Sequence, residues 1–141
     1  MCIRDRYSTV RSILQGKRVV VVDDSVVRGT TSRKIVNMIR DAGAKEIHFR
    51  VTAPPWQNPC FFGIDTPEKS KLLAANNTHE EMREFIGSDT LGFISAEGLY
   101  KVMPKTTGYC SACFTGVYPE GQKPETAEPA EIMVPLPFRV T

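Results

Sequence analysis

The sequence predicts an α/β fold built around a mainly parallel sheet flanked by helices, and three observations lead to this class. Residues 17–24, KRVVVVDD, are a β-branched run flanked by charge, which is typical of a strand buried on both faces of a parallel sheet. A helical period follows over residues 31–42, and a second strand pattern, KEIHFRVTAPP, follows over residues 45–55. Strand, helix and strand in this order form a right-handed βαβ unit.

The first predicted helix carries one apolar stripe and a clear stop signal. Gly43 suits the position just after the helix, and Pro54 and Pro55 end the strand that follows. The stripe at helical spacing consists of Ile35, Val36, Met38, Ile39 and Ala42.

The second half of the chain predicts two more helices and a third strand. Pro67 fits the first position of a short helix that carries Leu72 and Leu73. Thr78 and Glu81 form a capping-box pattern at the start of the next helix, which Gly87 would end. The segment DTLGFIS, residues 89–95, is the third predicted strand, and residues 96–103 predict one or two helical turns.

Order becomes doubtful beyond Pro104, and residues 119–137 hold five of the ten prolines, which predicts an extended C-terminal tail. We therefore divide the chain into an N-terminal segment at 1–15, a folded portion at 16–103, a cysteine-containing segment at 104–118 and a proline-rich tail at 119–141.

Length and composition indicate one globular domain and exclude some classes of function. The chain has 141 residues, 41% hydrophobic and 24% charged, with a formal net charge of +2 and scattered basic residues, so nothing favours nucleic-acid binding. No apolar run approaches the length of a membrane span. The first residues lack the apolar core of a signal peptide, so we expect a cytoplasmic protein, in which four cysteines are more typical of ligands or buried thiols than of disulfides.

Residues 29–32, Gly-Thr-Thr-Ser, have the composition of an anion-binding loop. A strand that passes through such a loop into a helix presents unpaired backbone N–H groups at the positive end of the helix dipole. Gly29 lets the backbone approach an anion without a Cβ in the way, and Thr30, Thr31 and Ser32 add hydroxyl donors. The segment is therefore predicted to hold one phosphate group.

Asp23 and Asp24 enter the same loop and would repel a phosphate if they pointed into it. At the carboxyl end of a strand they can instead face ribose hydroxyls or a Mg²⁺ ion. Phosphoribosyl pyrophosphate, which combines a 5′-phosphate, free ribose hydroxyls and a Mg-pyrophosphate, satisfies both features. The simpler interpretation is an acidic strand end exposed to solvent, followed by a helix that Thr30 or Thr31 caps.

Residues 19–32, VVVVDDSVVRGTTS, resemble the phosphoribosyl pyrophosphate signature of type I phosphoribosyltransferases, and the wider chain resembles the amidophosphoribosyltransferase family. The likeness to that family's C-terminal domain, in order and spacing, runs from about residue 7 to residue 119. It is carried by VRSILQGKRVVVVDDSVVRGTTSRKIV, DAGAKEIHFRVTAPP, PCFFGIDTP, EFIGSDTLGFIS and CSACFTGVYP. The resemblance implies a type I phosphoribosyltransferase-like fold.

The resemblance implies the first committed step of de novo purine biosynthesis, in which glutamine-derived ammonia displaces pyrophosphate to give 5-phosphoribosylamine. It also implies Mg²⁺ at Asp23 and Asp24, purine nucleotides as feedback inhibitors, and a homo-oligomer at full length. Arg28 fits a phosphate contact and a solvated surface charge equally well, and no general base is identified. The residues that the resemblance assigns to the substrate are Asp23, Asp24, Ser25, Val26, Val27, Arg28, Gly29, Thr30 and Thr31.

Cys110 and Cys113 form a CSAC motif, a spacing at which two thiolates can ligate one metal or cluster, although zinc, redox and incidental interpretations compete. In the iron–sulfur branch of the family, a [4Fe–4S] cluster is held by four cysteines. Three of them stand at the positions of Cys60, Cys110 and Cys113, and the fourth lies upstream. The fourth ligand would fall outside this sequence, so the resemblance implies an incomplete cluster site. Buried free thiols are the simpler interpretation.

The resemblance also identifies parts that this sequence lacks. The family's N-terminal glutaminase domain, its pyrophosphate-binding segment and its active-site lid have no counterpart here. Residues 1–6, MCIRDR, match nothing expected in the family, which fits foreign or mis-joined residues. We therefore expect a partial domain that turns over little or no substrate by itself.

Two other classes of protein share some of these features. A signalling receiver domain also has paired aspartates after its first strand, but Asp65 stands only loosely in the place of its phosphoacceptor. A non-catalytic relative that binds phosphoribosyl pyrophosphate or a nucleotide for regulation could keep the phosphate loop without the lid.

Overall fold

The computed structural model of the chain describes residues 9–66, 68–105 and 108–119. The expectations for residues 1–6, for Pro67 and for all but the first residue of the proline-rich tail lie outside these ranges.

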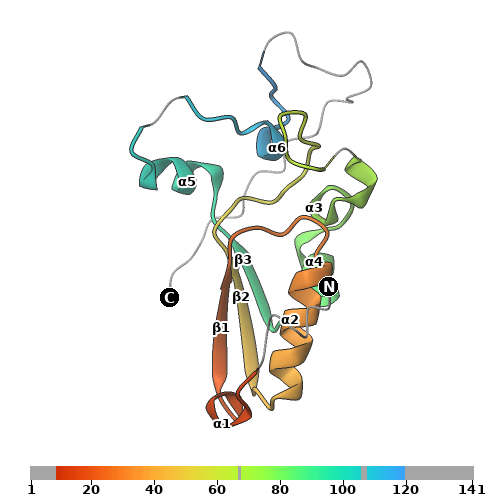
Figure 1. Cartoon of the computed structure of the whole chain (residues 1–141), viewed down its shortest axis with the longest axis vertical. Helices are drawn as coiled ribbons and strands as arrows, with labels where there is room; N and C mark the ends of the chain where they lie inside the picture. The colour runs from red at the N-terminus through yellow and green to blue at the C-terminus, as the bar shows by residue number, and fades with distance from the viewer. Residues whose placement is uncertain (1–8, 67, 106–107, 120–141) are drawn as a thin grey trace.

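Within the described ranges, three parallel strands form the sheet, in the order β1-β2-β3 (Figure 1). They are β1 (Arg18–Asp23), β2 (Glu46–Val51) and β3 (Thr90–Phe93), and Phe49 of β2 pairs with Val21 on one side and Leu91 on the other. The helix α2 (Thr30–Asp41) connects β1 to β2, which confirms the predicted βαβ unit. Because all strands are parallel, their carboxyl ends meet at one edge of the sheet.

The helices α2 and α4 (His79–Ile86) lie on one face of the sheet, and the core lies between them and the strands (Figure 1). Alternation along β2 places every second side chain in this core. The most buried members of the core are Val36 of α2, Ile47 and Phe49 of β2, and Ile86 of α4.

The expectation that the first strand is buried on both faces is wrong for the described part of the chain. Val20 and Val22 are 62% and 66% exposed, while the alternate residues Val19 and Val21 pack against the core. The physical reason is that β1 is an edge strand, and no described helix covers the opposite face of the sheet (Figure 1).

The predicted helix ends are confirmed. Thr78 and Glu81 form the capping box of α4, and Gly87 follows that helix with a positive φ of 83°. Gly43, just after α2, has a φ of 91°, a conformation that glycine adopts at little cost.

Short elements complete the chain. The single helix expected around Leu72 and Leu73 is instead two pieces, η2 (Lys69–Lys71) and α3 (Leu73–Asn76). The turns predicted after β3 form α5 (Ala96–Val102), and the segment of doubtful order contains α6 (Ala112–Thr115). A further turn, α1 (Arg11–Leu14), precedes β1. Among the described residues, no helix has the length and apolar character needed to cross a membrane.

Candidate phosphoribosyl-binding site

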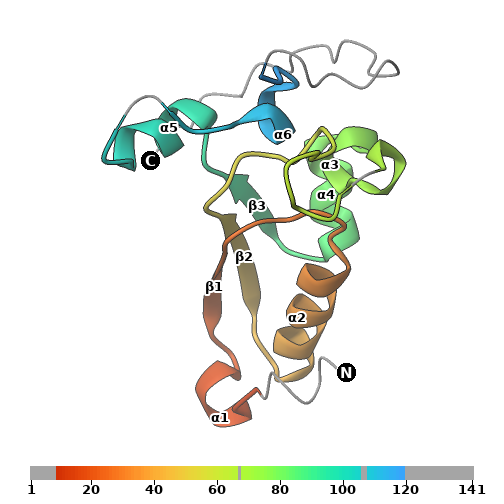
Figure 2. The ribbon, with the colours of Figure 1, turned by 45° about the horizontal axis from the view of Figure 1, so that its top comes forward.

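Residues 24–29, here called the phosphate loop, connect the carboxyl end of β1 to the start of α2 and overlap the predicted phosphate-binding residues 25–31. The loop runs above the strand ends toward α3 and α4 (Figure 2). In parallel α/β sheets, ligands bind at this edge, where strands end and helices begin.

Asp23 and Asp24 lie side by side in sequence but differ in environment. Asp23 is half-buried and Asp24 is exposed. Asp23 Oδ1 accepts the backbone N–H of Asp24 at 3.0 Å, and Asp24 Oδ1 accepts the hydroxyl of Ser25 at 2.9 Å. In the described part of the chain neither Oδ2 atom receives a hydrogen bond, so each carboxylate keeps an oxygen available to a ligand.

Burial raises the pKa of the Asp23 carboxyl above its usual value of 3.8; the backbone N–H of Asp24 opposes this rise, and the charge of Asp24 adds to it. The backbone of Asp23 is fixed because its carbonyl accepts the N–H of Thr52 at 2.9 Å. The pair thus combines a partly desolvated acid with a solvated one.

The backbone N–H groups of residues 25–32 donate no hydrogen bond to any described residue, whereas the next amide, that of Arg33, bonds the carbonyl of Gly29 at 2.9 Å. No side chain caps α2, whose N-cap residue is Gly29, so the interpretation that Thr30 or Thr31 caps the helix is wrong. A run of unsatisfied donors at a helix start is the arrangement that binds phosphate.

The predicted substrate residues of the loop divide into exposed and buried side chains. Thr30, Thr31 and Arg28 are exposed, and Ser25 is half-buried. Val26 is 3% exposed and belongs to the core, so it can offer a ligand only its backbone. Arg28 makes no ion pair among the described residues, which leaves both of its interpretations open.

Gly29 has a structural role that the sequence analysis did not identify. Its φ is 71°, and a Cβ at this position would lie 2.6 Å from Leu73 Cδ2 and 3.0 Å from Phe85 Cε1. The absent side chain therefore allows the loop to pack closely on α3 and α4. Local sequence carried no signal for this contact because its partners lie more than forty residues away.

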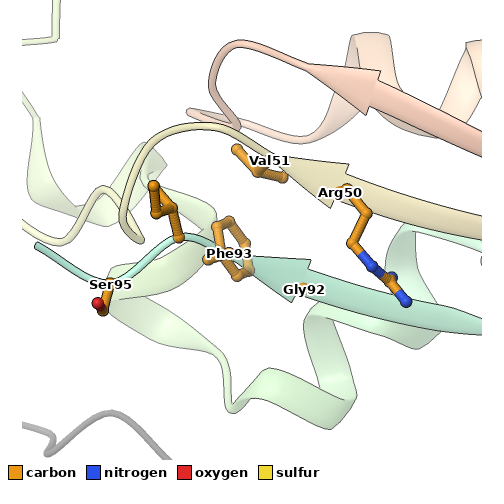
Figure 3. Close-up of a pocket in the computed structure, with 6 residues that line it drawn as sticks. Arg50, Val51, Gly92, Phe93 and Ser95 are labelled. Atoms are coloured by element: carbon orange, nitrogen blue, oxygen red, sulfur yellow. The ribbon is translucent and has the colours of Figure 1, made fainter. Parts of the chain in front are cut away.

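A pocket of about 330 Å³ opens at the carboxyl ends of β2 and β3 (Figure 3). Val51, which pairs with Asp23 across the strands, lines it together with Phe93, whereas the Arg50 guanidinium is held by the carbonyl of Phe49 at 2.9 Å and the hydroxyl of Thr90 at 3.0 Å. The pocket thus extends the same edge of the sheet with a mainly apolar surface.

The described cysteines are Cys60, in the loop after β2, and Cys110 and Cys113, in the segment around α6. The backbone N–H groups of Gln57 and Asn58 donate to the carbonyl of Cys113 at 3.1 and 3.0 Å. The Tyr118 hydroxyl donates to the carbonyl of Pro59 at 2.7 Å, and Trp56 packs edge-on against Phe114. These contacts bring Cys60 and the CSAC motif together.

Burial raises the pKa of the Cys113 thiol to about 11, and the nearby Cys60 and Cys110 thiols contribute to the rise. Among the described residues, however, no three His, Cys, Asp or Glu side chains are grouped closely enough to hold a metal ion. The three thiols are therefore neighbours without forming a complete ligand set.

Comparison with solved structures identifies the class of fold. The chain superposes on glutamine phosphoribosylpyrophosphate amidotransferase from Bacillus subtilis complexed with ADP and GMP, with a TM-score of 0.71 and 49% identity, over 83% of this chain and 28% of that one. A structure described as the allosteric regulatory enzyme of purine biosynthesis gives a TM-score of 0.71 and 48% identity over 82% of this chain and 27% of that one. The fold is therefore part of a phosphoribosyltransferase domain.

Comparison with curated proteins shows which enzymes the chain is similar to. It is 52% identical over 122 residues to the amidophosphoribosyltransferase of Bacillus subtilis, covering 83% of this chain and 26% of the relative. It is also 52% identical over 119 residues to the enzyme of Methanocaldococcus jannaschii, covering 84% and 25%. No family model matches the chain. The chain is thus homologous to amidophosphoribosyltransferases and spans about a quarter of their length, which confirms the resemblance.

Proposed function

We propose that the chain provides the phosphoribosyl-binding portion of an amidophosphoribosyltransferase. The reaction is the first committed step of de novo purine biosynthesis: ammonia derived from glutamine displaces pyrophosphate from phosphoribosyl pyrophosphate and gives 5-phosphoribosylamine. The observation that carries the proposal is the run of unsatisfied N–H groups at residues 25–32, directly after two acids at the carboxyl end of β1. Homology to the named enzymes at about 50% identity supports it.

In this proposal the amides of residues 25–31 and the hydroxyls of Thr30 and Thr31 bind the 5′-phosphate. Asp23 and Asp24 bind the ribose hydroxyls and a Mg²⁺ ion. The acids fit this ion because each has an unoccupied hard oxygen, and Mg²⁺ takes one or two carboxylates with the substrate phosphates and water completing its shell.

Catalysis would come from positioning and electrostatics. Positive charge develops on the ribose as the bond from the anomeric carbon to pyrophosphate breaks, and the carboxylates of Asp23 and Asp24 stabilise that charge. The role of bound Mg²⁺ is to neutralise charge on the leaving pyrophosphate. The phosphate loop holds the other end of the substrate and so fixes the anomeric carbon relative to the acids.

Calorimetry with Mg-phosphoribosyl pyrophosphate tests the assignment. We expect binding that EDTA abolishes and that Asp24→Asn weakens at least about tenfold, because one charge-assisted metal contact is lost. Asp41→Asn is the matched control, since Asp41 is an exposed acid at the far end of α2, and it should bind as the unchanged chain does. Equal affinity of the Asp24→Asn and Asp41→Asn variants would contradict the metal role.

We expect the chain alone to form little or no phosphoribosylamine from ammonia, because the family's lid and pyrophosphate-binding segment are not represented in it. Measurable formation by the purified chain would contradict this expectation. Supply of ammonia from glutamine, homo-oligomer formation and a cytoplasmic location belong to the same proposal for the full-length protein.

We further propose that Cys60, Cys110 and Cys113 are three ligands of a [4Fe–4S] cluster whose fourth ligand lies outside this chain. Their thiols suit iron–sulfur chemistry, and the contacts between the α6 segment and the loop after β2 bring them together. Anaerobic reconstitution with iron and sulfide should give visible absorption that Cys113→Ser removes and Cys2→Ser leaves unchanged. Identical spectra for both variants would contradict the assignment.

A regulatory role of the same site is the second candidate, favoured by the solved relative complexed with ADP and GMP. Purine nucleotides would then act as feedback inhibitors at or near the phosphate loop. Displacement of Mg-phosphoribosyl pyrophosphate by GMP would support this, whereas simultaneous binding without competition would place the nucleotide elsewhere.

A further inference from the structure

The phosphate loop packs against α3 and α4 through Leu73 and Phe85. The backbone N–H of Leu73 donates to the carbonyl of Val27 at 2.8 Å. The Leu73 side chain and the Phe85 ring fill the space where a Cβ of Gly29 would lie, at 2.6 and 3.0 Å. Val26, on the same loop, is buried in the core with Leu73. The loop is thus held against α3 and α4 at Val27 and Gly29, and Val26 lies in the same core.

The support extends to the first turn of α2. The guanidinium carbon of Arg33 lies 5.2 Å from the centre of the Phe85 ring, a cation–π distance. Phe85 therefore contacts the loop at Gly29 and the helix start at Arg33. The amides of residues 25–32 make no hydrogen bonds with described residues that could fix their orientation. Their orientation therefore depends on this packing.

A set of backbone donors binds an anion strongly only when its geometry is fixed before the ligand arrives, because ordering a loop during binding reduces the affinity. Val27 and Gly29 lie within the run of unbonded amides at residues 25–32, and both are held by residues of α3 and α4. The packing on these helices therefore determines how many of the backbone N–H groups can point at one anion at the same time.

We propose that Leu73 and Phe85 are positioning residues that hold the phosphate loop in its binding conformation and so set its affinity for a phosphorylated ligand. This inference rests on the proposed function for its ligand, although the fixed loop conformation can be measured without any ligand. Neither residue offers a group for chemistry, so both act through residues 26–29.

Two neighbouring leucines provide a matched test. Leu73→Ala removes the contact with Gly29, whereas Leu72→Ala removes an equally large side chain that is 1% exposed and whose amide bonds Lys69 rather than the loop. Both variants should lose global stability. Hydrogen exchange of the Arg33 amide, which donates to the carbonyl of Gly29 at 2.9 Å, should accelerate without ligand about tenfold more in Leu73→Ala than in Leu72→Ala. The dissociation constant for Mg-phosphoribosyl pyrophosphate should rise by a similar factor in Leu73→Ala alone.

The outcomes separate this inference from the proposed function. Equal exchange of the Arg33 amide in the two variants overturns the inference, as does faster exchange in Leu73→Ala with unchanged affinity. Faster exchange in Leu73→Ala, with no ligand binding even to the unchanged chain, supports the positioning role and contradicts the proposed function. Should Leu73→Ala fail to fold, Leu73→Val and Phe85→Leu remove part of the same contact and are expected to show smaller effects in the same direction.

Discussion

Replacing Gly29 by alanine tests the close approach of the phosphate loop to its supporting helices. The left-handed conformation, with φ at 71°, costs an L-residue about 1–2 kcal/mol. The new Cβ would lie 2.6 Å from Leu73 Cδ2 and 3.0 Å from Phe85 Cε1, and overpacking of this kind costs a further 1–3 kcal/mol or so. We therefore expect the free energy of unfolding to fall by about 2–5 kcal/mol, a large part of the roughly 5–15 kcal/mol that stabilises a typical domain.

Gly16→Ala is the control, because Gly16 has the same φ of 71° and nothing within 4 Å of its Cβ position. It should cost only the conformational part, about 1–2 kcal/mol. Urea unfolding followed by circular dichroism measures both values, and the difference isolates the steric part. If the two substitutions lower the free energy of unfolding equally, Gly29 does not pack against Leu73 and Phe85 as described.

Three further predictions concern other parts of the molecule. Thr78→Ala removes the hydroxyl that accepts the backbone N–H of Glu81 at 3.3 Å and should cost about 1 kcal/mol in urea unfolding; an unchanged midpoint would show that the cap does not stabilise α4. The Cys113 thiol has a pKa of about 11, and only the thiolate reacts with iodoacetamide, so its alkylation should be roughly ten times faster for each pH unit between 8 and 10. Peptide mass spectrometry measures the rate, with the exposed Cys110 as internal standard. A rate already constant by pH 9 would refute the raised pKa. The raised pKa of Asp23 means that the folded state binds the proton of this carboxyl more tightly than the unfolded state does. The group therefore stabilises the fold below pH 3.8 and loses that contribution as the pH rises through the folded-state pKa. Asp23→Asn should be at least as stable as the unchanged chain at pH 7 while binding Mg-phosphoribosyl pyrophosphate more weakly, and a large loss of stability at pH 7 would contradict the burial of the charged form.

The strands and helices with strong local patterns could be predicted from the sequence. The valine run, the helical stripe that ends at Gly43 and the capping box at Thr78 correspond to β1, α2 and α4. Each of these signals is local, since it depends on residues within one element. The position of the phosphate loop after β1 followed from the same local order of strand, loop and helix.

The parts that depended on distant contacts could not be predicted. Leu73 and Phe85 pack against Gly29, but they lie far from it in sequence, so no local pattern indicates this contact. The aromatic residues near Cys60 differ in the same way: Trp56 is buried, while Phe61 and Phe62 are 42% and 43% exposed. A run of apolar letters does not specify which side chains the rest of the fold will cover.

The uncovered side of β1 determines how the purified chain should behave in concentrated solution. Val20 and Val22 are exposed on one face of β1, and the outer edge of this strand has no described partner. Together they make a template on which a second molecule can add its own strand. The apparent molecular mass from light scattering should accordingly rise with protein concentration, and Val22→Lys should suppress the rise by placing charge on that side. The sheet that carries the phosphate loop would then also set the upper limit of the protein's solubility.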